Sequence, residues 1–175
     1  PFLFLLREKH ADHYKLIVES IRRVAPFFND FQLRPNPLNP DRIQLEWIEG
    51  QSDAYFNANS LSDGTLRFIC LATLLLQPNL PSTILIDEPE LGLHPFAIQM
   101  LASLLQQASS RTQVIVSTQS VTLVNQFTPD EVIVVNRGEG QSVFGRLNQD
   151  EIATWMDDYS LGELWEKNVL GGRPE

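Results

Sequence analysis

The chain has 175 residues and a mass of 19.9 kDa, a size that fits one domain. Apolar residues make up 43% of it and charged residues 20%, which excludes a disordered chain. The net charge is −9, and it is concentrated in residues 81–175, which hold 5 basic and 13 acidic side chains. Basic residues do not cluster anywhere, so the sequence gives no sign of a broad contact with a nucleic-acid backbone.

A single cysteine, Cys70, excludes an internal disulfide framework and a metal site built from several cysteines. This usage fits a reducing, cytoplasmic compartment. The longest apolar stretch, 68–76, is far shorter than the ~20 residues that span a bilayer. The apolar run 1–6 has no basic flank and no cleavage site, and it starts at a proline. We therefore expect a cut end, with these residues forming part of a larger protein.

The first third of the chain predicts a helix followed by a strand hairpin. Apolar residues at helical spacing predict an amphipathic helix over 8–25. Three prolines predict a loop over 34–41. Alternation of apolar and polar residues predicts a half-buried strand over 43–47, with 55–56 as its hairpin partner after a turn at 49–53.

The rest of the chain predicts alternating strands and helices. A nearly all-apolar helix is expected over 66–76, packed on most sides and with Cys70 inside the packing. Continuous apolar runs predict fully buried strands, which the intervening helices would connect as a parallel sheet. The expected strands are 84–86, 114–116 and 132–135, and a helix starts at Pro95 between the first two. A hairpin strand around 143–144 and short helices near 150–157 and 161–169 are expected after them, and 171–175 is expected to be a frayed end.

Two polar clusters follow the predicted parallel strands. Asp87, Glu88, Pro89 and Glu90 follow the first strand, and residues 117–120 (Ser-Thr-Gln-Ser) follow the second. Ligands gather at the carboxyl ends of parallel strands. There, one acid can hold hydrated Mg²⁺ while the next aligns or deprotonates an attacking water. The alternative is that one acid caps the next helix and the others are solvated.

A third cluster, Ser62, Asp63 and Gly64, lies at the start of the apolar helix. Free backbone N–H groups and the helix dipole favour an anion at such a position. Gly64 would let the backbone approach a phosphate closely, and Ser62 would add a hydroxyl. The alternative is an ordinary N-cap, since serine, aspartate and glycine are all common there.

With these three clusters the sequence resembles the ABC-type ATPases. Among these, it resembles the SMC/RecF/OLD-like group of DNA-repair and defence ATPases. Residues 61–65 (Leu-Ser-Asp-Gly-Thr) resemble the signature motif, and 84–90 (Ile-Leu-Ile-Asp-Glu-Pro-Glu) the Walker B strand. Residues 91–95 (Leu-Gly-Leu-His-Pro) resemble the D-loop, and 117–120 occupy the place of the switch motif. The order and spacing match over about 60–137.

Two features depart from the family pattern. The phosphate-binding loop, G-x-x-x-x-G-K-[ST], is missing, because none of the three lysines (Lys9, Lys15 and Lys167) precedes a serine or threonine. We therefore expect these residues alone to bind ATP weakly or not at all. Gln119 stands where the family usually has a histidine; an amide donates a hydrogen bond but does not become cationic near neutral pH.

The resemblance implies an α/β fold: a partial P-loop NTPase domain with a mostly parallel sheet flanked by helices. One domain would span 1–175, with a helix and hairpin in 1–59, the motif region in 60–137 and a hairpin with helices in 138–175. It further implies ATP and Mg²⁺ as ligands and a homodimer that sandwiches ATP. DNA is a client by family analogy, and no membrane partner is expected.

The resemblance also implies site roles. Asp87 would hold Mg²⁺ through water, Glu88 would be the general base and Gln119 would sense the γ-phosphate. The nucleotide contacts would further include Ser62, Asp63, Gly64, Thr118 and, near the subunit junction, His94. The alternative function is a dimerising interaction module that no longer hydrolyses ATP. A missing strand would also leave a gap in the sheet, which predicts self-association or a gap filled by residues 1–6.

Overall fold

The structure, a computed structural model, describes residues 1–50 and 54–172. The chain divides into two compact units, Pro1–Ser117 and Thr118–Glu175, and each is described by itself. The predicted turn at 49–53 and the predicted frayed end at 171–175 lie partly outside the described residues.

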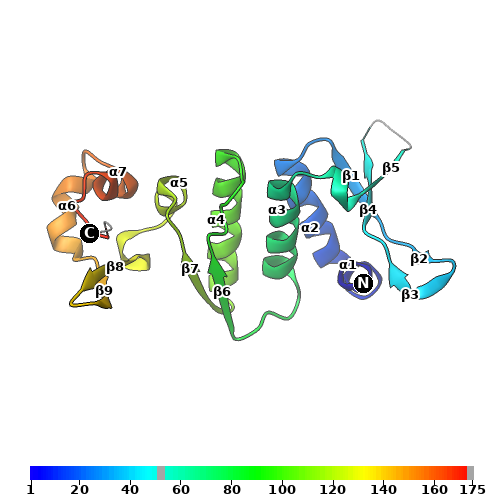
Figure 1. Ribbon diagram of the computed structural model, residues 1–175, viewed down its shortest axis with the longest axis horizontal. Helices are drawn as coiled ribbons and strands as arrows, with labels where there is room; N and C mark the ends of the chain where they lie inside the picture. The colour runs from blue at the N-terminus through cyan, green and yellow to red at the C-terminus, as the bar shows by residue number, and fades with distance from the viewer. Residues whose placement is uncertain (51–53, 173–175) are drawn as a thin grey trace. The chain divides into compact units, whose positions relative to one another are not determined.

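A pair of parallel strands organises the first unit. Strand β6 (Thr83–Asp87) pairs in parallel with β7 (Gln113–Ser117), and α4 (Pro95–Ser109) connects them (Figure 1). Proline at the first position of α4 fits its fixed φ and missing N–H, as the sequence predicts. The predicted strands and their parallel pairing are confirmed.

Only one face of this strand pair is buried, which corrects the expectation of fully buried strands. Ile84 is 4% exposed, whereas its neighbour Leu85 is 74% exposed and Ile115 on β7 is 48% exposed. A short apolar run has the same appearance whether one face or both are covered, so the sequence did not separate the two cases. An apolar face is left bare on β6 and β7.

Three helices cover the other side of the core. Helix α3 (Asp63–Leu76) contacts both α2 (Ala11–Val24) and α4 (Figure 1). Contact on two sides explains its nearly all-apolar sequence, and burying a side chain such as Phe68 contributes about 1.5–3 kcal/mol. Cys70 is exposed on this helix, which corrects the expectation that it packs inside.

Two segments of the amino-terminal part, residues 1–9 and 34–41, differ from their predictions. Residues Phe2–Lys9 form a separate helix, α1, which is in contact with α2 and buries Leu6. The segment 1–6 therefore packs in a helix pair within the first unit. The predicted loop over 34–41 contains the hairpin of β2 (Pro35–Asn36) and β3 (Asn39–Ile43), a two-stranded edge pairing that tolerates proline.

A small antiparallel sheet completes the first unit. Its order is β1 (Phe28–Gln32), β4 (Glu46–Glu49) and β5 (Tyr55–Asn57). The predicted pairing of a strand around Trp47 with residues 55–56 is confirmed, but that strand is Glu46–Glu49 and not 43–47, because Ile43 ends β3. Trp47 is buried in it and stacks on Phe56. Tyr14 of α2 donates a hydrogen bond of 2.6 Å to Asp30 on β1, and burial raises the pKa of this tyrosine well above its ordinary range.

The second unit holds an antiparallel hairpin and short helices. Strand β8 (Ile133–Gly138) pairs with β9 (Gln141–Arg146), as predicted, in a separate two-stranded sheet. Among the described residues β6–β7 is the one parallel pair, and the predicted strand 132–135 lies in the hairpin of the second unit. The helices are α5 (Val121–Val124), α6 (Gln149–Met156) and α7 (Leu161–Glu166), the last two close to their predicted positions.

Candidate functional site

The acidic turn, residues 87–90, begins where β6 ends. The strand register aligns Asp87 with Ser117, the last residue of β7. The Ser117 hydroxyl donates a hydrogen bond to Asp87 Oδ1, and the Glu88 N–H donates to the Ser117 carbonyl oxygen at 2.9 Å. Asp87 is exposed, so its carboxylate is oriented at the strand end while it faces solvent.

Glu88 has a backbone conformation that side chains other than glycine rarely adopt. Its φ is +45°, in the left-handed region, which costs about 1–2 kcal/mol for a residue with a Cβ. Its carbonyl oxygen accepts a hydrogen bond of 2.8 Å from Arg67 Nη1 and one of 3.2 Å from the Leu91 N–H. Strain of this kind persists only where surrounding contacts hold it, and it concentrates at functional sites.

The last two residues of the acidic turn are buried. Glu90 is 8% exposed and Pro89 is fully buried, while the Glu90 carbonyl accepts a hydrogen bond of 2.9 Å from the Leu93 N–H. The alternative in which the acids are simply solvated therefore does not describe Glu90. A turn anchored in this way presents Asp87 and Glu88 from a rigid base.

The serine–glycine turn, residues 62–64, starts helix α3. Ser62 is the N-cap: its Oγ accepts a hydrogen bond of 3.2 Å from the Thr65 N–H and lies 2.9 Å from Thr65 Oγ1. Asp63 is exposed in the first helical turn. The geometry therefore contains the ordinary capping interaction, and it leaves the nucleotide contacts expected for Ser62 and Asp63 as proposals.

Gly64 has a packing role that sequence reasoning missed. A Cβ built at Gly64 would lie 2.1 Å from the Gly92 carbonyl oxygen, a distance that no real contact allows. Gly64 is buried, and Gly92 has a φ of +78°. Close approach of the Gly92 carbonyl therefore explains Gly64, and the positive φ explains Gly92, whereas the sequence suggested only close approach to a phosphate.

His94 caps helix α4. Its Nδ1 accepts a hydrogen bond of 3.2 Å from the Phe96 N–H, and its side chain is exposed. This histidine follows the acidic turn and the glycine loop directly in the chain. Its predicted position beside a nucleotide at a subunit junction remains a proposal.

Thr118 and Gln119 belong to the second unit and follow Ser117 directly in the chain. Thr118 Oγ1 accepts a hydrogen bond of 3.0 Å from the Ser120 N–H, and Ser120 Oγ accepts one of 3.2 Å from the Leu123 N–H. Gln119 is exposed. These bonds fix the backbone that leaves β7 and turns into α5.

The first unit thus brings two of the predicted clusters together. Gly64 touches Gly92, and Arg67 of α3 binds the backbone of Glu88, so the serine–glycine turn and the acidic turn share one end of α3. Sequence reasoning missed Arg67, and it named Ser117 and Gly92 only as members of motifs, with no role of their own. Two signals were available, since Ser117 and Asp87 both end parallel strands and Arg67 is the lone charge among residues 66–76.

The side chains of the acidic turn suit Mg²⁺ better than they suit a metal ion that is coordinated by protein side chains alone. Within residues 1–50 and 54–172, no group of three or more His, Cys, Asp or Glu side chains could hold a metal ion. Mg²⁺ keeps several waters and is usually bound by one or two carboxylates together with substrate phosphates. The exposed, oriented carboxylate of Asp87 suits that mode of binding.

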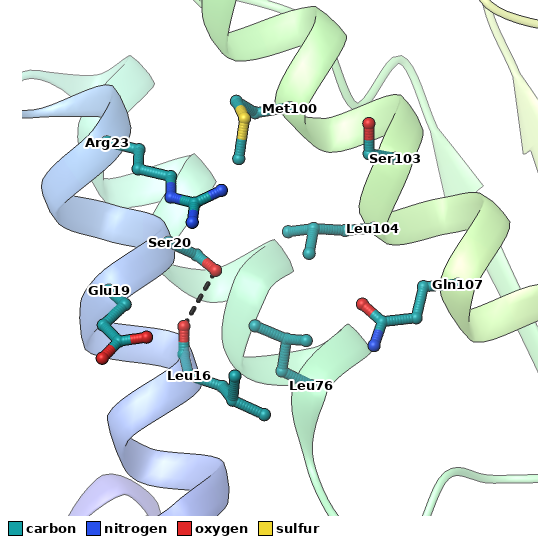
Figure 2. A pocket seen from close by; sticks show the side chains of 9 residues that line it. All are labelled: Leu16, Glu19, Ser20, Arg23, Leu76, Met100, Ser103, Leu104 and Gln107. Carbon is teal, nitrogen blue, oxygen red and sulfur yellow. Dashed lines mark hydrogen bonds between the residues drawn. The ribbon is translucent and has the colours of Figure 1, made fainter.

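A pocket of about 230 Å³ lies elsewhere on the first unit (Figure 2). It is formed by α2, the last residue of α3 and residues 100–107 of α4, at the opposite end of α3 from the two turns. Leu16, Leu76 and Leu104 are among its apolar lining residues, and Arg23 and Gln107 among its polar ones. None of the predicted site residues lines it.

No helix in the described part of the chain is both long enough and apolar enough to cross a membrane.

Comparison with known proteins bears out the sequence resemblance. The family described as "AAA domain, putative AbiEii toxin, Type IV TA system" matches residues 4–125. The phosphate import ATP-binding protein PstB of Mycoplasma pneumoniae is 30% identical over 111 residues, and that of Mycoplasma genitalium is 27% identical over 109 residues. The alignments cover 60% and 59% of this chain but only 33% and 32% of the relatives, so the chain spans about a third of their length.

Solved structures of SMC heads share the fold. The Smc head domain of Pyrococcus furiosus, bound to the C-terminal domain of ScpA, has a TM-score of 0.66 at 18% identity and covers 89% of this chain and 39% of its own. A structure from work on ATP-driven dimerization and DNA stimulated activation of SMC ATPases has a TM-score of 0.59 at 18% identity and covers 90% and 96%.

These likenesses confirm the predicted α/β, P-loop NTPase class. The chain belongs to the family described as "AAA domain, putative AbiEii toxin, Type IV TA system".

Proposed function

We propose that these residues form the half of an ATP-hydrolysing site that supplies the magnesium carboxylate, the general base and the signature turn. One observation carries the proposal. The acidic turn holds Glu88 in a strained backbone conformation, between Ser117 on one side and Arg67 on the other. Backbone strain that surrounding contacts maintain at one carboxylate residue is typical of functional sites.

In this proposal Asp87 and Glu88 divide the work of phosphoryl transfer. Asp87, oriented by Ser117, would hold hydrated Mg²⁺ through a water. The ion, bound with ATP, would neutralise charge on the phosphate oxygens. Glu88 would accept the proton of the water that attacks the γ-phosphate, with its carboxylate facing the nucleotide. We propose that the left-handed backbone of Glu88 serves that placement.

Gln119 and Thr118 are proposed to approach the γ-phosphate from the switch position. The Gln119 amide donates a hydrogen bond, in place of the histidine usual in the family. Removing one donor from a transition state costs about 10²–10³ in rate, and replacing it by another donor costs less. We therefore propose that hydrolysis is retained with Gln119, at a reduced rate.

The signature turn is proposed to act across a dimer. Ser62, Asp63 and Gly64 would meet the nucleotide that the other copy holds, with His94 near the junction. The N-terminal end of α3, with its free N–H groups and dipole, favours a phosphate. A similar solved structure comes from work on ATP-driven dimerization of SMC ATPases, which supports a homodimer for this chain.

We also propose that these 175 residues by themselves bind ATP weakly. The sequence contains no G-x-x-x-x-G-K-[ST], the loop whose backbone and lysine hold the phosphates. A competent site therefore needs a phosphate-binding loop that these residues do not supply. The proposal extends to a cytoplasmic protein in DNA repair or phage defence, with DNA as a client by family analogy; the acidic balance of residues 81–175 lends DNA no support.

The alternative is an interaction module that dimerises without hydrolysing ATP. The observation that favours it is Gln119, since loss of the family's histidine is one way to lose hydrolysis. Both functions keep the same fold and the same turns. They differ in whether the carboxylate of Glu88 matters for turnover.

The decisive experiment measures ATP hydrolysis by the protein that contains these residues together with a phosphate-binding loop. We expect hydrolysis in the parent and a loss of at least about 10²-fold in the Glu88→Gln variant, with ATP binding retained. Glu139→Gln is the matched control, because Glu139 also has positive φ, +50°, but lies in the β8–β9 hairpin. Equal turnover in both variants contradicts the role of Glu88, and no hydrolysis in the parent favours the interaction module.

A further inference from the structure

We infer that Arg67 is a positioning residue for Glu88. The inference rests on the proposed function, because it concerns how the proposed base is held. It adds a residue that lies outside the acidic turn and whose side chain acts on the backbone of Glu88. Its role would be to maintain the left-handed conformation from which the carboxylate is presented.

The contact itself is direct. Arg67 Nη1 donates a hydrogen bond of 2.8 Å to the Glu88 carbonyl oxygen, across 21 positions of sequence and in a partly buried setting. Hydrogen bonds from a charged donor are about twice as strong as neutral ones. Within residues 1–50 and 54–172, Arg67 forms no ion pair. Its guanidinium instead binds a carbonyl of the acidic turn.

Hydrogen bonds fix the two peptide groups on either side of the Glu88 α-carbon. Its N–H binds the Ser117 carbonyl at 2.9 Å, which fixes the side of the turn that faces β7. Its carbonyl binds Arg67, and also the Leu91 N–H at 3.2 Å. A residue at φ +45° returns to a relaxed conformation by rotating these peptide groups, so the two anchors oppose that rotation from opposite sides.

The helix that carries Arg67 also carries the serine–glycine turn. Arg67 lies five positions after the N-cap Ser62, and Gly64 between them packs against Gly92. Glu88 and the serine–glycine turn are thus fastened to one rigid element at two points. Arg67 is the single charged residue among the mostly apolar residues 66–76. This placement points to the acidic turn as the reason for the arginine.

Amide hydrogen exchange tests the inference without any nucleotide. Arg67→Gln removes the cation and shortens the donor, so we expect the Glu88 and Leu91 amides to exchange about tenfold faster than in the parent chain. Arg111→Gln is the matched control, because Arg111 Nη2 likewise binds backbone carbonyls of this unit, those of Gln77 and Pro78. The control should leave both amides at their parental rate. Equal acceleration in the two variants, or none with Arg67→Gln, overturns the inference.

Arg67→Lys guards against a variant that fails to fold. Lysine keeps the charge and one donor, so exchange at the two amides should fall between the rates of the parent and Arg67→Gln. In the protein with a complete ATP site, Arg67→Gln should lower kcat about tenfold with KM for ATP unchanged, and Arg67→Lys should restore part of the loss. A purely structural role would change folding stability without this split.

The two proposals fail in distinguishable ways. If Glu88→Gln hydrolyses ATP as the parent does, the proposed function is wrong whatever Arg67 does. If Glu88→Gln is inactive while Arg67→Gln has parental exchange rates and kcat, only the positioning role of Arg67 is wrong.

Discussion

The α-carbon of Gly64 packs directly against the carbonyl of Gly92, with no room for a Cβ between them. This contact joins the start of α3 to the loop that follows the acidic turn. It makes one glycine a requirement of the fold itself, before any ligand is considered.

Gly64→Ala should therefore destabilise the first unit. The added methyl would lie 2.1 Å from a backbone oxygen, so the backbone has to move, at a cost of about 2–3 kcal/mol. Chemical denaturation of the 175-residue chain measures this. Gly50→Ala is the control, because nothing lies within 4 Å of a Cβ at Gly50. A stability for Gly64→Ala that matches the control would contradict the close approach.

The Glu88→Gly variant should be more stable than the Glu88→Ala variant, although alanine is usually the more stabilising of the two residues. Glu88→Gly and Glu88→Ala both remove the carboxylate, but only glycine accepts φ +45° without strain, a difference of about 1 kcal/mol. The same pair of substitutions at Glu19, inside α2, should favour alanine by about 1 kcal/mol. Urea denaturation of the four variants measures both orders. Alanine above glycine at both positions would remove the evidence for strain at Glu88.

The hydrogen bond from Tyr14 to Asp30 should make stability fall at alkaline pH. The pKa of Tyr14 is raised above its ordinary 10.0, first by burial and then by Asp30, so the unfolded chain loses this proton before the folded one does. The contribution is complete below pH 10 and is lost as pH rises toward the folded pKa. Tyr14→Phe should remove that part of the pH dependence and cost about 1 kcal/mol at pH 7.

Denaturation curves of the parent and Tyr14→Phe, from pH 8 upward, test this statement. Tyr55→Phe is the control, since Tyr55 is exposed. A parallel alkaline decline in the parent and Tyr14→Phe would contradict the role of Tyr14.

Glu163 should titrate below its ordinary value. The backbone N–H and the hydroxyl of Ser160 both donate to Glu163 Oε2 at 2.8 Å, and these bonds hold the pKa of Glu163 below 4.5. A lowered pKa contributes stability that is present above pH 4.5 and is lost as pH falls through the folded pKa. The carboxyl carbon shift, followed by NMR, should show a midpoint below 4.5. Ser160→Ala removes the hydroxyl bond and keeps the backbone bond, which is the larger cause, so the midpoint should rise part of the way toward 4.5. An unchanged midpoint would reject the hydroxyl bond as a contributor.

Local patterns predicted the elements that carry the site. The apolar helix over 66–76, the strands around 84–86 and 114–116 and the proline-started α4 all lie where their residues indicated. The parallel register that aligns Asp87 with Ser117 follows from the same pattern. These features depend on periodicity and on capping residues, which are written in short stretches of sequence.

Features that depend on packing were not predictable in the same way. The apolar runs 114–116 and 132–135 predict fully buried strands, yet Ile115, Ile133 and Val135 are about half exposed. The φ of Glu88 and the approach of Gly64 to Gly92 arise from contacts between segments far apart in the chain. No nearest-neighbour pattern encodes them.

The bare side of β6 and β7 has a practical consequence for anyone who expresses these 175 residues. Leu85 and Ile115 offer an apolar surface beside two strands that each keep one edge without a partner strand in the described residues. Such a surface recruits identical molecules as concentration rises. Preparations should scatter light and bind hydrophobic dyes, and Leu85→Lys should raise the concentration at which they begin to precipitate.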